Sequence, residues 1–199
     1  MKKIVVLIMI LVLITGCTAV RIDTSSIDNT MNVVLSKNND LFNRIGKGYK
    51  YYVPRGVNYI DNNELNDKLY TNGDYYYLYI DVISNYYKKS FNYVFDNNAY
   101  YSKAIDINNK NGYLEINKIN DKYLIEFMYN YAKIEAFVDY NKINDVILNS
   151  SYILSTVKFN NNVIKLMLDT NYFINKEEQY DIFTSEKITD KFLKYTEEE

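Results

Sequence analysis

Alternating apolar and polar positions mark residues 100–139 as a set of antiparallel strands. Asn111-Gly112, Asn120-Asp121 and Tyr129-Asn130 are candidate two-residue turns between these strands. The registers that the three turns imply place the same apolar side chains on one face of the sheet: Ile107, Leu114, Ile116, Ile125, Phe127, Ala132 and Ile134. A slip of one residue would move this whole set into water, so the pattern specifies a meander with one buried face.

Apolar residues three and four positions apart predict helices on either side of these strands. The first helix is expected from Ser25 to Ile45, with Asp28 approximating a capping box with Ser25. A second helix is expected from Asn141 to about Phe159, suited to cover the apolar sheet face. Its stripe consists of Ile143, Val146, Ile147, Ile153, Leu154 and Val157. Residues 163–168 indicate a short helix or strand.

Shorter strands are expected between the first helix and the meander. Tyr49–Pro54 and Val57–Ile60 have strand composition, and Asn72-Gly73 is a strong hairpin signal. The second arm of that hairpin is expected over Tyr75–Ile83. Tyr86–Phe95 either extends this arm or begins the next strand.

The fold class that follows is α+β, an antiparallel meander sheet packed against helices. A single domain is expected over residues 25–175, because the chain is long enough for one real core and marginal for two. Residues 176–199 are expected to form a charged C-terminal tail that ends in three glutamates.

The first 17 residues, MKKIVVLIMILVLITGC, have a different pattern. Two lysines precede an apolar run, Ile4–Ile14, which ends at Thr15-Gly16 and the only cysteine of the chain, Cys17. As a helix, a run of about 11 residues rises only about 16 Å, roughly half the thickness of the hydrocarbon layer. The run is therefore too short to span a membrane but suits the apolar core of a signal peptide.

Met1–Cys17 resembles the signal sequence and lipobox of bacterial lipoproteins. The resemblance, which covers these residues only, implies that residues 1–16 are a cleaved signal peptide and that the Cys17 thiol is joined to diacylglycerol. Residues 17–24 would then be a lipidated tether, with the mature chain held on the extracytoplasmic face of the cell membrane by two acyl chains. The alternative is an uncleaved membrane helix, extended to Val20, with an incidental cysteine.

Composition excludes several kinds of chemistry. The chain has no histidine, which excludes a Ser-His-Asp triad, a Cys-His pair and any histidine-ligated metal. If Cys17 carries lipid, thiol catalysis and a disulfide are excluded too. Loss of residues 1–16 removes two lysines and leaves 21 basic and 25 acidic side chains, a net charge of −4. This weak acidity argues against nucleic acid as a partner and suggests no polybasic patch. We expect no cofactor and no metal.

One candidate site lies on the polar face of the meander. The registers place Glu115 across from Glu126, Glu126 across from Lys133, and Asn108 on the other side of Glu115. Two carboxylates that close could share a proton, hold calcium with Asn108, or resemble the pair of a retaining glycosidase. The alternative is a solvated face on which Lys133 offsets the repulsion.

A second candidate is a tyrosine row, Tyr75, Tyr77 and Tyr79, which alternation places on one strand face. Aromatic rings in a row can stack on glycan rings. The alternatives are a sheet face half-buried beneath the first helix, and a tyrosine content that only reflects AT-rich codons.

Together these patterns favour a lipid-anchored, extracytoplasmic protein of the bacterial cell envelope without catalytic residues. The most favoured role is a binding or accessory module that recognises wall glycan, peptide or another envelope protein. A structural subunit of a membrane-bound complex and a carboxylate-dependent enzyme acting on wall glycan remain as alternatives.

Overall fold

The computed structural model describes residues 24, 26–63 and 65–173. The predicted signal peptide, Cys17, nearly all of the predicted tether and the predicted C-terminal tail lie outside the described residues. No helix in the described part of the chain has the length and apolar character needed to cross a membrane.

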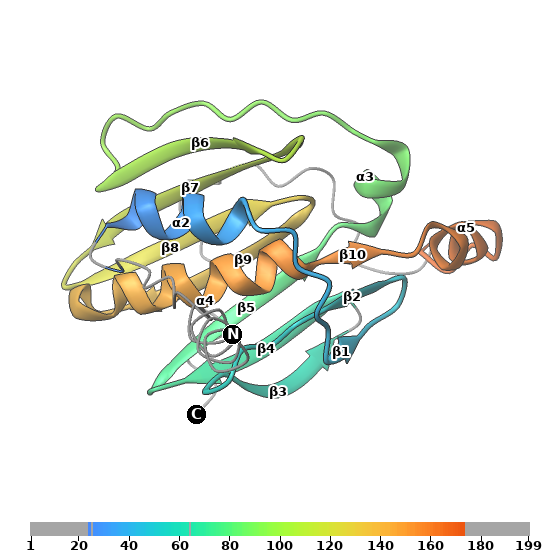
Figure 1. The fold of residues 1–199 in the computed structure, drawn as a ribbon, viewed down its shortest axis with the longest axis horizontal. Helices are drawn as coiled ribbons and strands as arrows, with labels where there is room; N and C mark the ends of the chain where they lie inside the picture. Colours follow the sequence, from blue (N-terminus) through green and yellow to red (C-terminus); the bar gives the residue numbers. More distant parts are fainter. Residues whose placement is uncertain (1–23, 25, 64, 174–199) are drawn as a thin grey trace, which may run out of the picture.

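A seven-stranded antiparallel sheet forms the body of the fold (Figure 1). Its strands, in sheet order, are β3 (Asn58–Asn63), β4 (Asn66–Thr71), β5 (Asp74–Ile80), β9 (Ala132–Val138), β8 (Lys122–Tyr129), β7 (Lys110–Ile119) and β6 (Tyr101–Ile107). Two meanders, β3-β4-β5 and β6-β7-β8-β9, join where β5 pairs with β9. The predicted hairpin at Asn72-Gly73 is confirmed, since Thr71 pairs with Asp74 and both turn residues have positive φ.

Two helices, α2 (Ile27–Leu35) and α4 (Ile143–Thr156), lie side by side on one face of this sheet (Figure 1). The short 3₁₀ helix η1 (Tyr140–Lys142) leads into α4. The core between the helices and the sheet contains all the apolar meander positions that alternation placed on one face, with Ile107 partly buried at its margin. The predicted stripe of α4 is fully buried as well. The α+β prediction is therefore confirmed.

The turns of the meander agree only in part with the prediction. The turn at Asn120-Asp121 is confirmed, because Leu114 pairs with Phe127 and Glu115 with Glu126. The predicted turn at Asn111-Gly112 is wrong: the chain turns at Asn108-Asn109, both with positive φ, and Ile107 pairs with Lys110. Gly112 lies inside β7, where a Cβ atom would come 2.1 Å from the carbonyl oxygen of Met128. The absence of a side chain at Gly112 thus allows β7 and β8 to approach closely at this point.

The third turn is displaced by one residue, to Asn130-Tyr131, where both residues again have positive φ. Phe127 consequently pairs with Ile134, and Glu126 pairs with Glu135 where Lys133 was expected. In both displaced turns the partner of a given residue moves along the neighbouring strand by an even number of residues: from Ile116 to Lys110 for Ile107, and from Ala132 to Ile134 for Phe127. Each side chain therefore stays on its predicted face while its cross-strand neighbour changes.

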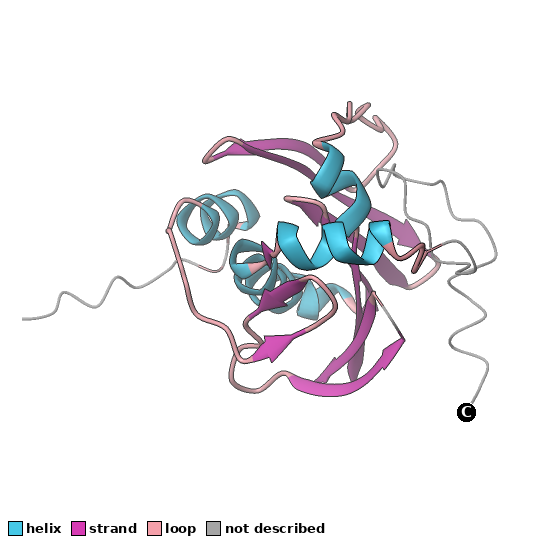
Figure 2. Cartoon of the chain, turned by 90° about the vertical axis from the view of Figure 1, so that its right-hand side faces the viewer, coloured by secondary structure: helices cyan, strands magenta, loops and turns pink. Residues whose placement is uncertain are grey.

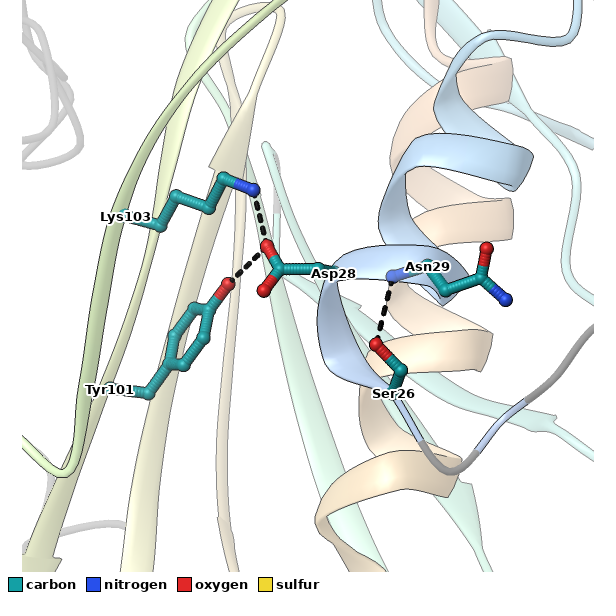
Figure 3. A network of polar contacts seen from close by, with 5 residues as sticks. All are labelled: Ser26, Asp28, Asn29, Tyr101 and Lys103. Carbon is teal, nitrogen blue, oxygen red and sulfur yellow. Dashed lines mark hydrogen bonds and ion pairs between the residues drawn. The ribbon is translucent and has the colours of Figure 1, made fainter.

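The first helix is shorter than predicted. It ends at Leu35 because the polar residues 37–40 interrupt the apolar stripe, and Leu41 and Phe42 beyond them are exposed. At its start Ser26 is the N-cap and accepts a hydrogen bond from the Asn29 amide at 3.3 Å. Asp28 takes no part in a capping box, since it contacts the edge strand β6 (Figure 3). There it accepts from the Tyr101 hydroxyl at 2.9 Å and pairs with Lys103.

A small sheet and two short helices form one end of the molecule (Figure 2). The sheet contains β1 (Arg44–Ile45), β2 (Tyr49–Tyr51) and β10 (Lys158–Phe159), and the helices are α3 (Val82–Tyr87) and α5 (Asn161–Asp169). Residues 163–168 are thus helical, and α4 ends at Thr156, three residues before the predicted end. Tyr86–Phe95 was predicted either to extend the β5 strand or to begin the next one, and both predictions are wrong. Tyr86 and Tyr87 belong to α3, and the chain that follows is irregular up to Tyr100.

Candidate functional site

The predicted carboxylate pair lies on the outer face of the large sheet, by which we mean the face opposite α2 and α4. Glu115 of β7 and Glu126 of β8 pair directly across the strands, as alternation predicts. Both side chains are buried, with 2% and 4% of their surface exposed. Two adjacent carboxylates at this depth require compensating donors or cations.

Two side chains donate hydrogen bonds to Glu115: Tyr93, from the segment between α3 and β6, and Asn117 of β7. The Tyr93 hydroxyl donates to Glu115 Oε2 and lies 2.7 Å from the Ser102 hydroxyl. Asn117 Nδ2 donates to Glu115 Oε1 at 2.8 Å. The Tyr93 ring stacks on the buried Tyr113 ring with centroids 4.6 Å apart, which fixes this segment over the strands.

Lys133 of β9 provides the cation. Its Nζ lies 2.7 Å from Glu135 Oε1 and 3.9 Å from Glu126 Oε1, so one ammonium group faces two carboxylates. Lys133 reaches Glu126 diagonally, because Glu135 occupies the directly opposed position. Burial, followed by the nearby carboxylates, raises the pKa of the Tyr113 hydroxyl well above 10. Burial and the hydrogen bond to Glu115 likewise raise the pKa of Tyr93. Both phenols therefore stay protonated.

The structure does not bring Asn108 to this cluster. Asn108 is a turn residue whose Nδ2 donates to the Leu35 carbonyl at 3.0 Å, on the helix side of the sheet. Ser102 takes the expected place beside Glu115, because the β6–β7 turn lies earlier than predicted. The predicted calcium set is thus not assembled. Among residues 24, 26–63 and 65–173, no three acidic or cysteine side chains are grouped closely enough to hold a metal ion.

The tyrosine row also lies on the outer face. Tyr75, Tyr77 and Tyr79 are half-buried, whereas the alternate residues of β5 face the helices and are buried. The alternative that places the row beneath the first helix is therefore wrong. Lys133 Nζ lies 5.5 Å from the centroid of the Tyr79 ring, and Tyr77 pairs with Glu135. The row and the carboxylate cluster thus share one polar and aromatic surface.

A third site was missed in the sequence: a pocket of about 620 Å³ where β1, β3 and β4 meet. Asp67 of β4 forms its buried floor, with 4% of its surface exposed. The Tyr51 hydroxyl donates to Asp67 Oδ2, and Asn62 Nδ2 donates to Asp67 Oδ1 at 2.6 Å. The residues that line this pocket, called the Asp67 pocket below, are Asn43, Arg44, Ile45, Gly46, Lys47, Tyr59, Asn62 and Asp67.

Charges of both signs meet in the Asp67 pocket. Burial raises the pKa of Asp67 above its ordinary 3.8, against the lowering effect of its two hydrogen bonds and of Arg44. The Arg44 guanidinium lies 4.2 Å from the centroid of the Tyr59 ring, which holds it at the wall. The sequence did contain a signal for this site. Asp67 lies between Leu65 and Leu69 in a strand whose odd positions face inward, and a carboxylate in that position must find buried donors.

Comparison with family models, with curated protein sequences and with solved structures finds no match for this chain.

Proposed function

We propose that this protein is a lipid-anchored, non-catalytic binding module of the bacterial cell envelope, and that it takes its ligand in the Asp67 pocket. The anchor is supported by the sequence pattern of Met1–Cys17, which resembles a lipoprotein signal with its lipobox. The single observation that carries the binding role is a buried carboxylate at the floor of a pocket with an arginine at its wall.

The arrangement of Glu115 and Glu126 supports the non-catalytic part of the proposal. A general acid or nucleophile must reach its substrate. Here Glu115 accepts hydrogen bonds from Tyr93 and Asn117, and Glu126 lies beside Lys133, with both carboxylates almost fully buried. Such a network fixes the segment between α3 and β6 onto the sheet, which is a stabilising role.

The groups in the Asp67 pocket suit a ligand with many hydroxyl or amide groups. Asp67 itself is almost fully buried, and its hydrogen bonds with Tyr51 and Asn62 fix the floor of the pocket, so the ligand contacts fall to the groups at the wall. Arg44 presents donors at the wall, and Tyr59 offers an aromatic face. Fragments of wall glycan and its peptides have this chemistry, and they surround a protein on the outer face of the membrane.

Isothermal titration of the purified full-length mature protein with peptidoglycan fragments tests this proposal. We expect saturable binding, weakened about 10- to 100-fold by Arg44→Gln, since one hydrogen bond to a charged group contributes roughly 1.5–3 kcal/mol. Arg55→Gln is the matched control: Arg55 is an exposed arginine in the adjacent loop and does not line the pocket. Mass spectrometry of the fragments after incubation with the protein shows whether they have been cleaved.

Three results would contradict the proposal. Absence of binding by the folded protein would exclude peptidoglycan fragments as the ligand. Equal affinities of the Arg44→Gln and Arg55→Gln variants would exclude the Asp67 pocket as the binding site. Cleaved fragments would overturn the non-catalytic role and favour the enzyme alternative.

A further inference from the structure

The end of the molecule that carries the small sheet has an unusual surface. A groove of about 690 Å³ runs between β1, β2, β10 and α5, and its walls are mostly apolar. Large apolar side chains stand exposed on both sides of it. They are Leu41, Phe42, Ile45, Val163 and Leu166. Ile45 and Leu166 have 77% and 63% of their surface exposed, so this end of the molecule exposes apolar surface to water, which is unfavourable.

The same surface is positively charged. The described residues that line the groove include Lys47, Lys50 and Lys158 and no acidic side chain. Lys50 Nζ lies 3.9 Å from the centroid of the Phe42 ring, and Lys158 pairs with the exposed Asp40 at the rim. Composition suggested no basic patch, because it gives only the average charge of the chain. We call this lysine-bearing apolar surface the docking face.

We propose that the docking face lies against the anionic phospholipid surface of the membrane. A single ligand in the groove would leave Leu41 and Leu166 in water, since neither of them lines it, whereas a bilayer covers the whole face. Exposed apolar side chains next to lysines form the combination that inserts at the boundary between headgroups and acyl chains.

This inference rests on the proposed lipid anchor. Ser26 lies nine positions after Cys17, so the chain between them extends at most about 32 Å. An anchored domain therefore stays within reach of the bilayer, and its effective concentration at the surface is high, so a weak contact suffices to orient it. The orientation would hold the domain in one fixed relation to the wall.

The test uses the lipidated full mature chain reconstituted in vesicles. Because Cys17 is the only cysteine and carries lipid, one introduced cysteine can be spin-labelled selectively. Leu166→Cys probes the docking face, and Asp121→Cys is the control. Asp121 lies in the β7–β8 turn, at the opposite end of β8 from the Asn130-Tyr131 turn, whose Tyr131 ring contacts Phe159 of β10. Collision with oxygen and with a nickel chelate gives the depth of each label.

We expect the label at position 166 to lie below the phosphate level in phosphatidylglycerol vesicles and in water on phosphatidylcholine vesicles. The label at position 121 should stay in water on both. Lys50→Gln/Lys158→Gln should lower the ratio of docked to undocked protein by up to about 25-fold, at about fivefold per lysine near an anionic surface. Lys118→Gln/Lys122→Gln, two exposed lysines at the control end, should leave the ratio unchanged.

Three outcomes would overturn the inference. The first is equal aqueous exposure of the two labels on anionic vesicles. The second is a depth at position 166 that the Lys50→Gln/Lys158→Gln variant does not change. The third is shielding of position 166 in neutral detergent that rises with protein concentration, which would indicate a second copy on this face. An unmodified Cys17 thiol, read from the mass of the same sample, would overturn the anchor together with the docking. A lipidated chain with position 166 in water would overturn the docking alone.

Discussion

The contact between Tyr51 and Asp67 joins the small sheet to the large sheet and forms the floor of the proposed binding pocket. Tyr51 has 0% of its surface exposed and Asp67 has 4%, so neither group can exchange its partner for water. Hydrogen bonds to charged groups contribute about 1.5–3 kcal/mol, and a buried group that loses its partner costs about 1–3 kcal/mol. We therefore expect Tyr51→Phe and Asp67→Ala each to lower the free energy of unfolding by about 2–3 kcal/mol.

Because both substitutions break the same contact, the double variant should lose less than the sum of the two. We expect a coupling energy of about 1.5–2 kcal/mol in a double-mutant cycle measured by urea unfolding at pH 7. Tyr52→Phe, a half-buried neighbour on the same strand segment, is the matched control and should show no coupling to Asp67→Ala. A Tyr51–Asp67 coupling below about 0.5 kcal/mol would refute the contact and, with it, the geometry of the pocket floor.

Because Asp67 is titratable, its contribution to the free energy of unfolding depends on pH. Its pKa is raised in the folded state above the ordinary 3.8, mainly by burial, so the fold favours the protonated form. The folded state consequently binds more protons than the unfolded state, and the contribution of Asp67 to stability falls as pH rises from about 3.8 through the folded pKa. Asp67→Asn should remove this decline. Urea unfolding of both proteins across that acidic window, with no difference in slope, would contradict the assignment.

Three further substitutions test the architecture. Gly112→Ala should cost about 1–3 kcal/mol or prevent folding, because its Cβ would meet the Met128 carbonyl at 2.1 Å, whereas Asn111→Ala next to it should cost little in the same urea titration. Tyr93→Phe should cost about 1–2 kcal/mol, because buried Glu115 loses a donor, and Tyr87→Phe on the exposed α3 surface should cost nothing measurable. Asp28→Asn should cost under about 1 kcal/mol, since its pairing with Lys103 is half-exposed, and this contribution should shrink in high salt. The lowered pKa of Asp28 means that its contribution is present above pH 3.8 and is lost at lower pH.

From the alternation of apolar and polar residues, the core-facing side chains of the meander were predicted more accurately than the positions of its turns. A side chain keeps its face under any even shift of register, so Leu114 and Ile125 were placed correctly although two turns were misplaced. Asparagine adopts positive φ readily, and the stretch between β6 and β7 offers three asparagines, Asn108, Asn109 and Asn111. Local sequence alone does not choose among them. The position of Gly112 under the Met128 carbonyl depends on the neighbouring strand, which no local pattern contains.

The candidate sites differ in how far the sequence could reach them. Glu115 and Glu126 are partners across a single turn, so pairing rules alone place them together. The Asp67 pocket needs Tyr51 from the small sheet, and that contact between two sheets follows from packing. The docking face collects lysines from residues 47–50 and 158, which only the pairing of β2 with β10 brings together. An average charge over the chain conceals such a cluster.

The lipid on Cys17 is the claim on which the location, the envelope ligand and the membrane contact all depend. Intact mass spectrometry of the native protein, extracted with detergent from its own cells, tests it most directly. We predict a chain that begins at Cys17 and carries a diacylglyceryl group on its sulfur. A chain that begins at Met1 with an unmodified thiol would contradict the account.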